Sequence, residues 1–180
     1  MKTYLKYGGA MAGAGFVSMV LCYVAGLWDA QNLGTGMIVG IVLGIIINTV
    51  GIVLGTRAVR SPTGTQGFSY GRAFKTGLLI SSFAAAAGVV TNGIFFGVVN
   101  PNYHETTIVW TKGLMERMGA PAAQVEKAEE QMRTKGGLVR QLANGVIGAL
   151  VFGGVISLIT AAFMKRPPSD EETDGPPVIS

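Results

Sequence analysis

The stretch LGTGMIVGIVLGIIINTVGIVLGT, residues 33–56, contains no Asp, Glu, Lys, Arg or His. A helix of about 20 apolar residues crosses the hydrocarbon core of a bilayer, so this stretch is long enough to span a membrane. Uncharged runs of similar length cover residues 7–28, 76–103 and 141–164. We therefore predict an all-α integral membrane protein with four transmembrane helices, at about 7–28, 33–56, 76–100 and 141–164.

The composition agrees with this class of protein. Charged residues make up 13% of the chain, about half of the roughly 25% found in an ordinary soluble domain, and the mean hydropathy is +0.44. We expect a lipid bilayer around the chain and no nucleic-acid partner. Cys22 is the only cysteine, so no disulfide can form within the chain, and a lone thiol in an apolar helix is a small packing residue.

Basic residues predict the orientation, because cytoplasmic segments near helix ends carry an excess of Lys and Arg. The first run is longer than the apolar core of a signal peptide and lacks an Ala-x-Ala-like cleavage site, so we expect it to remain a membrane helix. Eight basic residues lie on the side of the two termini: Lys2, Lys6, Arg57, Arg60, Arg72, Lys75, Lys165 and Arg166. The other six lie between the third and fourth runs: Lys112, Arg117, Lys127, Arg133, Lys135 and Arg140. Both termini are therefore predicted to be cytoplasmic.

The segment between the third and fourth runs predicts a short two-helix extracytoplasmic cap, at about 104–138. Its first half repeats apolar residues at helical spacing in Trp110, Leu114 and Met118, with Ile108 and Met115 beside them, which predicts one apolar stripe facing the membrane surface or the outer mouth of the bundle.

The second half of this cap begins at Pro121, a residue suited to a first helical turn. Val125, Ala128 and Met132 share one side of the predicted helix, and Gly136 with Gly137 ends it.

The single histidine, His104, follows the point where the third span is predicted to leave the lipid. Pro101 disfavours helical geometry at Asn100, and Tyr103 suits the interfacial belt. A metal site would need further ligands, and there is no second histidine. We interpret His104 as a boundary residue and predict no metal site, no cofactor and no catalytic residue.

Small residues recur every four positions in the predicted spans. Membrane helices pack through such faces because lipid tails provide no hydrophobic drive between helices, and close backbone approach gains dispersion contacts. The predicted helix-packing residues are Gly36, Gly40, Gly44, Gly93, Gly97, Gly145, Ala149 and Gly153. These faces could serve helices of the same chain, a second copy in a homo-oligomer or another membrane protein.

Polar side chains are few in the predicted spans, and ionisable ones are absent from their cores. Proton relays and ion-coupled carriers need ionisable groups at membrane depth, so charge-coupled transport is disfavoured. Ser81 and Ser82 have no base in the spans to activate them, which disfavours an enzyme. If a polar pathway exists, Asn48 and Asn92 are its expected members.

Four motifs then indicate a family. They are FSYGRAFKTG at 68–77, VNPNYHE at 99–105, VEKAEEQM at 125–132 and GGVISLITAAFMKR at 153–166. In order and spacing they resemble the bacterial membrane proteins grouped as domain of unknown function family 4199. The resemblance covers residues 68–166 and implies a four-helix protein of a bacterial inner membrane, without any functional residues to transfer.

The sequence thus predicts a four-span membrane domain over residues 1–166, followed by a disordered acidic tail over 167–180. The expected function is that of a non-enzymatic inner-membrane protein with a structural or partner-binding role. The alternative is a passive channel or carrier for a neutral or lipidic small molecule. Water inside the bundle would separate the two.

Overall fold

The computed structural model describes residues 1–60 and 67–165. These residues form α-helices and one π-helical turn, and no β-strand occurs among them. In chain order the elements are α1 (Lys2–Val24), α2 (Leu33–Arg60), α3 (Tyr70–Ile94), the π-helical turn η2 (Phe95–Val99), α4 (Tyr103–Arg117), α5 (Ala122–Lys135) and α6 (Leu138–Met164). The predicted acidic tail at 167–180 lies outside the described residues.

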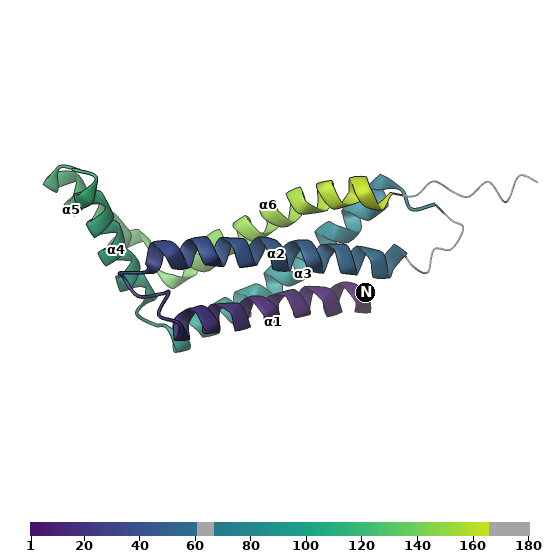
Figure 1. Cartoon of the computed structure of the whole chain (residues 1–180), viewed down its shortest axis with the longest axis horizontal. Coiled ribbons are helices and arrows are strands. Elements are labelled where there is room, and N and C mark those ends of the chain that lie inside the picture. Colours follow the sequence, from purple (N-terminus) through teal and green to yellow (C-terminus); the bar gives the residue numbers. More distant parts are fainter. Residues whose placement is uncertain (61–66, 166–180) are drawn as a thin grey trace, which may run out of the picture.

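Four of the described helices, α1, α2, α3 continued by η2, and α6, are long and apolar enough to cross a membrane. They lie side by side, and α4 and α5 lie beyond one end of them (Figure 1). We call this end the hairpin end, because α4 and α5 form a helical hairpin there. The opposite end, where α1 begins and α6 finishes, is the terminal end. The prediction of an all-helical chain with four apolar helices of this length is confirmed.

Large apolar side chains on these helices face outward. Ile38, Ile41 and Val42 on α2, and Val151 and Phe152 on α6, are all exposed. Soluble monomers rarely expose contiguous apolar surface of this kind. The outward faces of α2 and α6 are therefore suited to contact with lipid tails.

The long helices differ from the predicted spans mainly at their ends. The helix α3 begins at Tyr70, six residues before the predicted span, because the Ser69 side chain caps it by accepting a hydrogen bond from the Arg72 amide at 3.3 Å. At the other end, η2 widens the helix, and the Asn100 amide donates to the Phe95 carbonyl at 2.7 Å. Asn100 then leaves helical geometry at φ −133° and ψ 68°, as expected for the residue before Pro101.

The first helix ends earlier than predicted. It stops at Val24, and Gly26 reverses the chain with φ +70°, a left-handed conformation that favours glycine. The following turn folds over the start of α2, so that a Cβ at Gly36 would lie 2.9 Å from the Leu27 carbonyl carbon. Trp28, predicted at the end of the first span, therefore belongs to this turn, and its indole Nε1 donates to the Met19 carbonyl at 3.2 Å.

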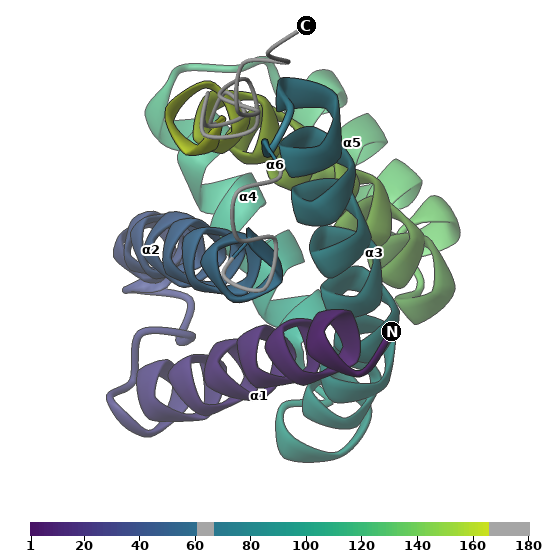
Figure 2. The same cartoon turned by 90° about the vertical axis from the view of Figure 1, so that its right-hand side faces the viewer.

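Among the long helices, α3 packs against all three others. Figure 2, viewed from the terminal end, shows α3 between α1 and α6, with α2 on the opposite side of the bundle. Small residues allow the closest approach: a Cβ at Gly77 of α3 would lie 2.8 Å from the Ser157 Cβ of α6, and one at Gly153 would lie 2.5 Å from the Ser81 Cβ. At two successive turns, therefore, a serine of one helix packs against a glycine of the other.

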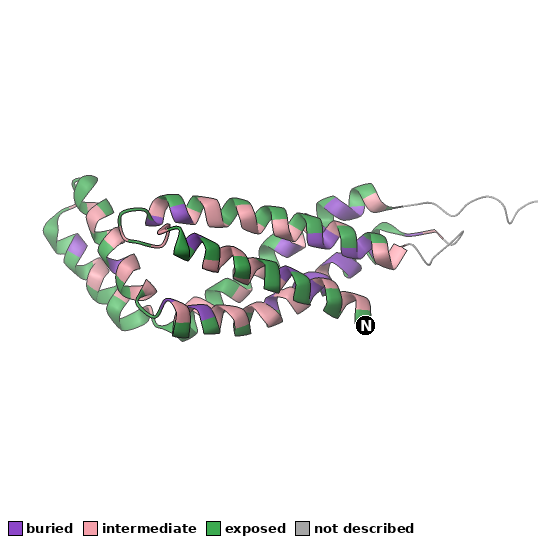
Figure 3. Cartoon of the chain, turned by 60° about the horizontal axis from the view of Figure 1, so that its bottom comes forward, coloured by how far each residue is buried: buried purple, intermediate pink, exposed green. Residues whose placement is uncertain are grey.

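Buried side chains gather in the terminal half of the bundle (Figure 3). One cluster joins Met11, Ile52 and Ile80 from α1, α2 and α3. A second, closer to the terminal end, joins Phe68 and Ala73 to Ala161. The terminal half is therefore closely packed across all four long helices.

The helices α4 and α5 form an antiparallel hairpin. Ile108 is 2% exposed and Val125 is 6% exposed, and these two are the hairpin's buried apolar side chains in the described structure. Thr111 and Met115 of α4 share the inner face with Ile108, opposite Val125. Leu114 and Met118 of the predicted stripe lie on the exposed side of α4.

Candidate functional site

The hairpin half of the bundle contains a cavity of about 370 Å³ between α1, α2, α3 and α6. This volume lies in the range of ~300–1,000 Å³ that is usual for small-molecule sites. Most of its lining residues are apolar or glycine, and the polar ones are Asn48, Ser81, Thr91, Asn92 and Gln141. An apolar cavity with a few converging polar groups is the usual character of a ligand site.

Asn48 on α2 and Asn92 on α3 line this same cavity. Each Nδ2 donates to a carbonyl oxygen one turn earlier on its own helix, Asn48 to Gly44 and Asn92 to Gly88, both at 2.8 Å. Within the described residues no other hydrogen bond engages these two side chains. Their carboxamide oxygens therefore retain acceptor capacity in a mainly apolar cavity.

The cavity is closed toward the terminal end. Met11 and Ser81 line its base, and below them lie the cluster of Met11, Ile52 and Ile80 and the close contact of Gly77 with Ser157. Ile52 and Ile80 are fully buried. The described residues thus block the cavity toward the terminal end.

A second hollow, of about 500 Å³, lies beside the hairpin between α4, α5 and the start of α6. We call it the groove; its polar lining includes His104, Lys135, Arg140, Gln141 and Asn144. Gln141 also lines the cavity, so the two hollows adjoin. This connection was not predicted, because it depends on how α6 lies beside the hairpin.

His104 follows the end of η2 and lies at the start of the hairpin. It lies in the first turn of α4 and packs against the backbone between α5 and α6, where a Cβ at Gly136 would lie 3.3 Å from its Nε2. No three His, Cys, Asp or Glu side chains come together as a possible metal site in the part of the chain that the structure describes.

A cluster of aromatic rings lies beside the cavity at the hairpin end. The Phe96 ring, which lines the cavity, lies 4.7 Å from the Tyr103 ring, which lines the groove. Trp28 packs on Tyr103 with ring centres 5.3 Å apart. Burial raises the pKa of the Tyr103 phenol, and its hydrogen bond with Thr107 partly offsets this. Tyr103 is therefore a neutral, largely enclosed wall between the two hollows.

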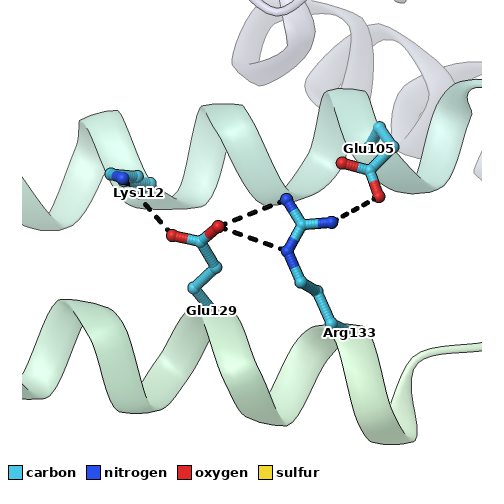
Figure 4. Close-up of polar contacts among 4 residues, drawn as sticks. All are labelled: Glu105, Lys112, Glu129 and Arg133. Atoms are coloured by element: carbon cyan, nitrogen blue, oxygen red, sulfur yellow. Dashed lines mark hydrogen bonds and ion pairs between the residues drawn. The ribbon is translucent and has the colours of Figure 1, made fainter.

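Charged side chains hold the hairpin together on its exposed side (Figure 4). Arg133 Nη1 lies 2.7 Å from Glu105 Oε1, and its Nη2 lies 3.2 Å from Glu129 Oε1. Lys112 Nζ contacts the other Glu129 oxygen at 3.3 Å. The pKa of Glu129 is lowered, mainly by its hydrogen bond from Lys112 and next by that from Arg133. The pKa of Arg133 is raised, mainly by its hydrogen bond to Glu105 and next by that to Glu129.

The predicted packing residues occupy different environments. Gly36 and Gly153 closely approach another segment of the chain, as described above. A Cβ at Gly40, Gly44, Gly93, Gly97 or Gly145 would meet nothing within 4 Å among the described residues. Of the predicted set, Gly44, Gly145 and Ala149 line the cavity.

Sequence reasoning missed two close contacts. A Cβ at Gly8 of α1 would lie 2.7 Å from the Phe83 Cβ, and Gly77 lies against Ser157 as described. The available signal was that Gly77 and Ser81 share a spacing of four with Gly153 and Ser157. That repeated glycine–serine pair is the small-residue pattern of helix interfaces.

These features define a class: an all-helical chain with four apolar helices of membrane-spanning length and a cavity between them. The family model described as protein of unknown function (DUF4199) matches residues 6–166, and the chain belongs to this family. The match extends beyond the resemblance predicted over 68–166 and includes α1 and α2. No curated protein and no solved structure matches the chain.

Proposed function

We propose that this chain is a non-enzymatic, multi-pass protein of a bacterial inner membrane that binds a small neutral or lipidic molecule in its cavity. The observation that carries the proposal is a hollow of about 370 Å³, bounded by all four long helices and lined by Asn48 and Asn92. Its apolar walls suit an apolar ligand, and the two carboxamides could fix one polar group.

The closed terminal half favours a binding site over a continuous channel. A passive channel would need a polar path past Ile52 and Ile80, and both side chains are fully buried in an apolar cluster. The proposal therefore retains the lipidic or neutral ligand of the carrier hypothesis but places it in a pocket within the hairpin half of the bundle.

The proposed orientation puts both termini in the cytoplasm and the hairpin outside, forming an extracytoplasmic cap. Eight of the basic residues support it, because they lie close to helix ends on the side of the termini. A ligand would then enter from the outer leaflet or from the outer solution.

Alanine-to-cysteine substitutions test the cavity with little change in side-chain volume. In a chain carrying Cys22→Ser, single substitutions Ala12→Cys, Ala85→Cys and Ala149→Cys place thiols on three of its walls. The matched controls are Ala161→Cys, at a fully buried position, and Ala14→Cys, at an exposed position on α1. A small water-soluble thiol reagent added from outside should label the cavity positions and neither control.

The labelling patterns have distinct meanings. Protection of the three cavity positions by added lipid extract would support occupancy by a lipidic ligand. Labelling at none of the three would contradict an accessible cavity. Labelling of Ala161→Cys along with them would instead favour a continuous channel.

A second candidate function is binding of a protein partner or a second copy. Leu114 and Met118 are exposed on the hairpin, at 38% and 77%, and Gly40 presents an open small-residue position on α2, outside the cavity lining. Two variants test these surfaces: Leu114→Glu with Met118→Glu, and Gly40→Leu. Loss of a cross-linked complex in membranes would support the altered surface, with Gly9→Leu on α1 as the glycine control.

A further inference from the structure

The groove beside the cavity is cationic. Lys135 at the end of α5 and Arg140 in the first turn of α6 both line it, together with uncharged polar side chains such as Gln131 and Asn144. No Asp or Glu is among the residues that line the groove. Its charge therefore suits an anionic group.

The two cations are available to such a group. Neither Lys135 nor Arg140 forms an ion pair with any residue that the structure describes. The nearest carboxylate along α4, Glu105, is already paired with Arg133 at 2.7 Å. Glu105 is thus already paired, and the groove lining contains cations but no carboxylate.

The groove and the apolar cavity adjoin at Gln141. Gln141 lines both, and one residue of the next turn, Gly145, lies on the cavity side while Asn144 lies on the groove side. Phe96 and Tyr103 form the facing wall with rings 4.7 Å apart. A molecule with one polar and one apolar end can therefore occupy both hollows at once.

We propose that the ligand is an anionic amphiphile, whose acidic head lies in the groove between Lys135 and Arg140 and whose single apolar chain extends past Gln141 into the cavity. This inference rests on the proposed function of the cavity and adds the class of its ligand. Apolar walls of about 370 Å³ receive the chain, and basic side chains near a membrane surface attract anionic lipid heads.

The test uses the full chain in a neutral maltoside detergent and counts bound lipid by native mass spectrometry. The probes are lysophosphatidylglycerol and lysophosphatidylcholine with the same acyl chain; the first has an anionic phosphoglycerol head and the second a zwitterionic phosphocholine head. The wild-type chain should bind the anionic probe at least about tenfold more tightly, since two cations each contribute to head recognition. Glycerol 3-phosphate, the head without a chain, should not bind measurably.

Two sets of variants separate head from chain recognition. Lys135→Gln with Arg140→Gln should reduce binding of the anionic probe to the level of the zwitterionic one. The matched control is Lys127→Gln, an exposed lysine of α5 that lies outside the groove. Gly145→Leu and, independently, Gly15→Leu fill the cavity from two walls and should weaken both probes. The control Gly148→Leu changes α6 equally but lies outside the cavity lining.

The outcomes distinguish this inference from the proposed function. Equal binding of both probes, with loss of both in Gly145→Leu and Gly15→Leu, would overturn the anionic head while leaving the cavity as the site. Unchanged binding in both cavity-filling variants would overturn the proposed function itself. Binding of glycerol 3-phosphate alone would show an anion site that needs no chain, and would also overturn the inference.

Discussion

The side chain of Ser81 on α3 lies against the backbone of Gly153 on α6, so closely that a Cβ at position 153 would be 2.5 Å from the Ser81 Cβ. One turn away the relationship is reversed, because Ser157 of α6 lies on Gly77 of α3. The hydroxyls bond within their own helices, Ser81 to Gly77 at 3.0 Å and Ser157 to Gly153 at 2.6 Å. Close backbone packing, rather than a hydrogen bond between helices, therefore joins α3 to α6 at this level.

This contact predicts the effect of adding one carbon atom. Gly153→Ala should lower the free energy of unfolding by about 1–3 kcal/mol, since the new methyl group overpacks the interface. Adding Ser81→Gly should recover part of this loss. Unfolding in mixed micelles measures both values. Gly154→Ala is the control, because a Cβ there meets nothing within 4 Å; equal destabilisation by the two alanines would contradict the interface.

The cavity asparagines predict a change in hydration with little change in stability. Replacing both, by Asn48→Leu and Asn92→Leu, removes their amides from the cavity. Among the described residues these amides bond only within their own helices. We expect a stability change of about 0.6 kcal/mol or less for each. Labelling of Ala85→Cys by a water-soluble reagent should fall severalfold. Thr49→Leu, at an exposed position of α2, should leave labelling unchanged.

The buried hydroxyl of Thr56 predicts a stabilising substitution. Thr56 is fully buried in α2, and its Oγ1 has no hydrogen-bond partner among the described residues. An unsatisfied buried polar group costs about 1–3 kcal/mol, and valine has nearly the same shape. Thr56→Val should therefore raise the free energy of unfolding by about 1 kcal/mol, whereas the exposed Thr49→Val should have little effect. A loss of stability would mean that the hydroxyl is satisfied.

The ion-pair network predicts that acid loosens the hairpin. The pKa of Glu129 is lowered in the fold, so its contribution is present above the ordinary glutamate value of about 4.3 and is lost as the pH falls through the folded-state pKa. Spin labels at Val109 and Thr134, in a Cys22→Ser chain, would report the spacing of α4 and α5. The distance distribution should broaden on acidification.

The same measurement at neutral pH tests Glu129 directly. Glu129→Gln should broaden the distribution without acid, because Lys112 and Arg133 both lose their shared partner. Glu126→Gln serves as the control, since Glu126 lies on the same helix and forms no ion pair with the described residues. An unchanged distribution in Glu129→Gln would show that the apolar pair of Ile108 and Val125 holds the hairpin alone.

Much of the helical architecture could be predicted from local sequence. Uncharged runs identify the four long helices, and Pro101, Pro121 and the pair Gly136–Gly137 mark where helices end or begin. Errors occurred at helix ends, where capping decides the boundary. Ser69 extends α3 into a charged segment, and Gly26 ends α1 before Trp28.

The packing faces could be predicted only in part, because a spacing of four shows that small residues share a face but does not show what that face meets. Gly153 meets Ser81, whereas Gly145, two turns earlier on the same helix, lines a cavity. In the hairpin, likewise, Ile108 rather than Leu114 faces α5. The rotation of each helix about its own axis determines these outcomes.

The sequence by itself determined the class of this protein, since the length and apolarity of a run decide whether one helix can cross a membrane, and these are properties of the segment alone. It also placed Asn48 and Asn92 at depth within such runs. Only the tertiary structure brought the two asparagines to one cavity, closed that cavity at Ile52 and Ile80, and placed the groove of Lys135 and Arg140 next to it. These relationships depend on how several helices cross and rotate, because each is a contact between residues far apart in the chain.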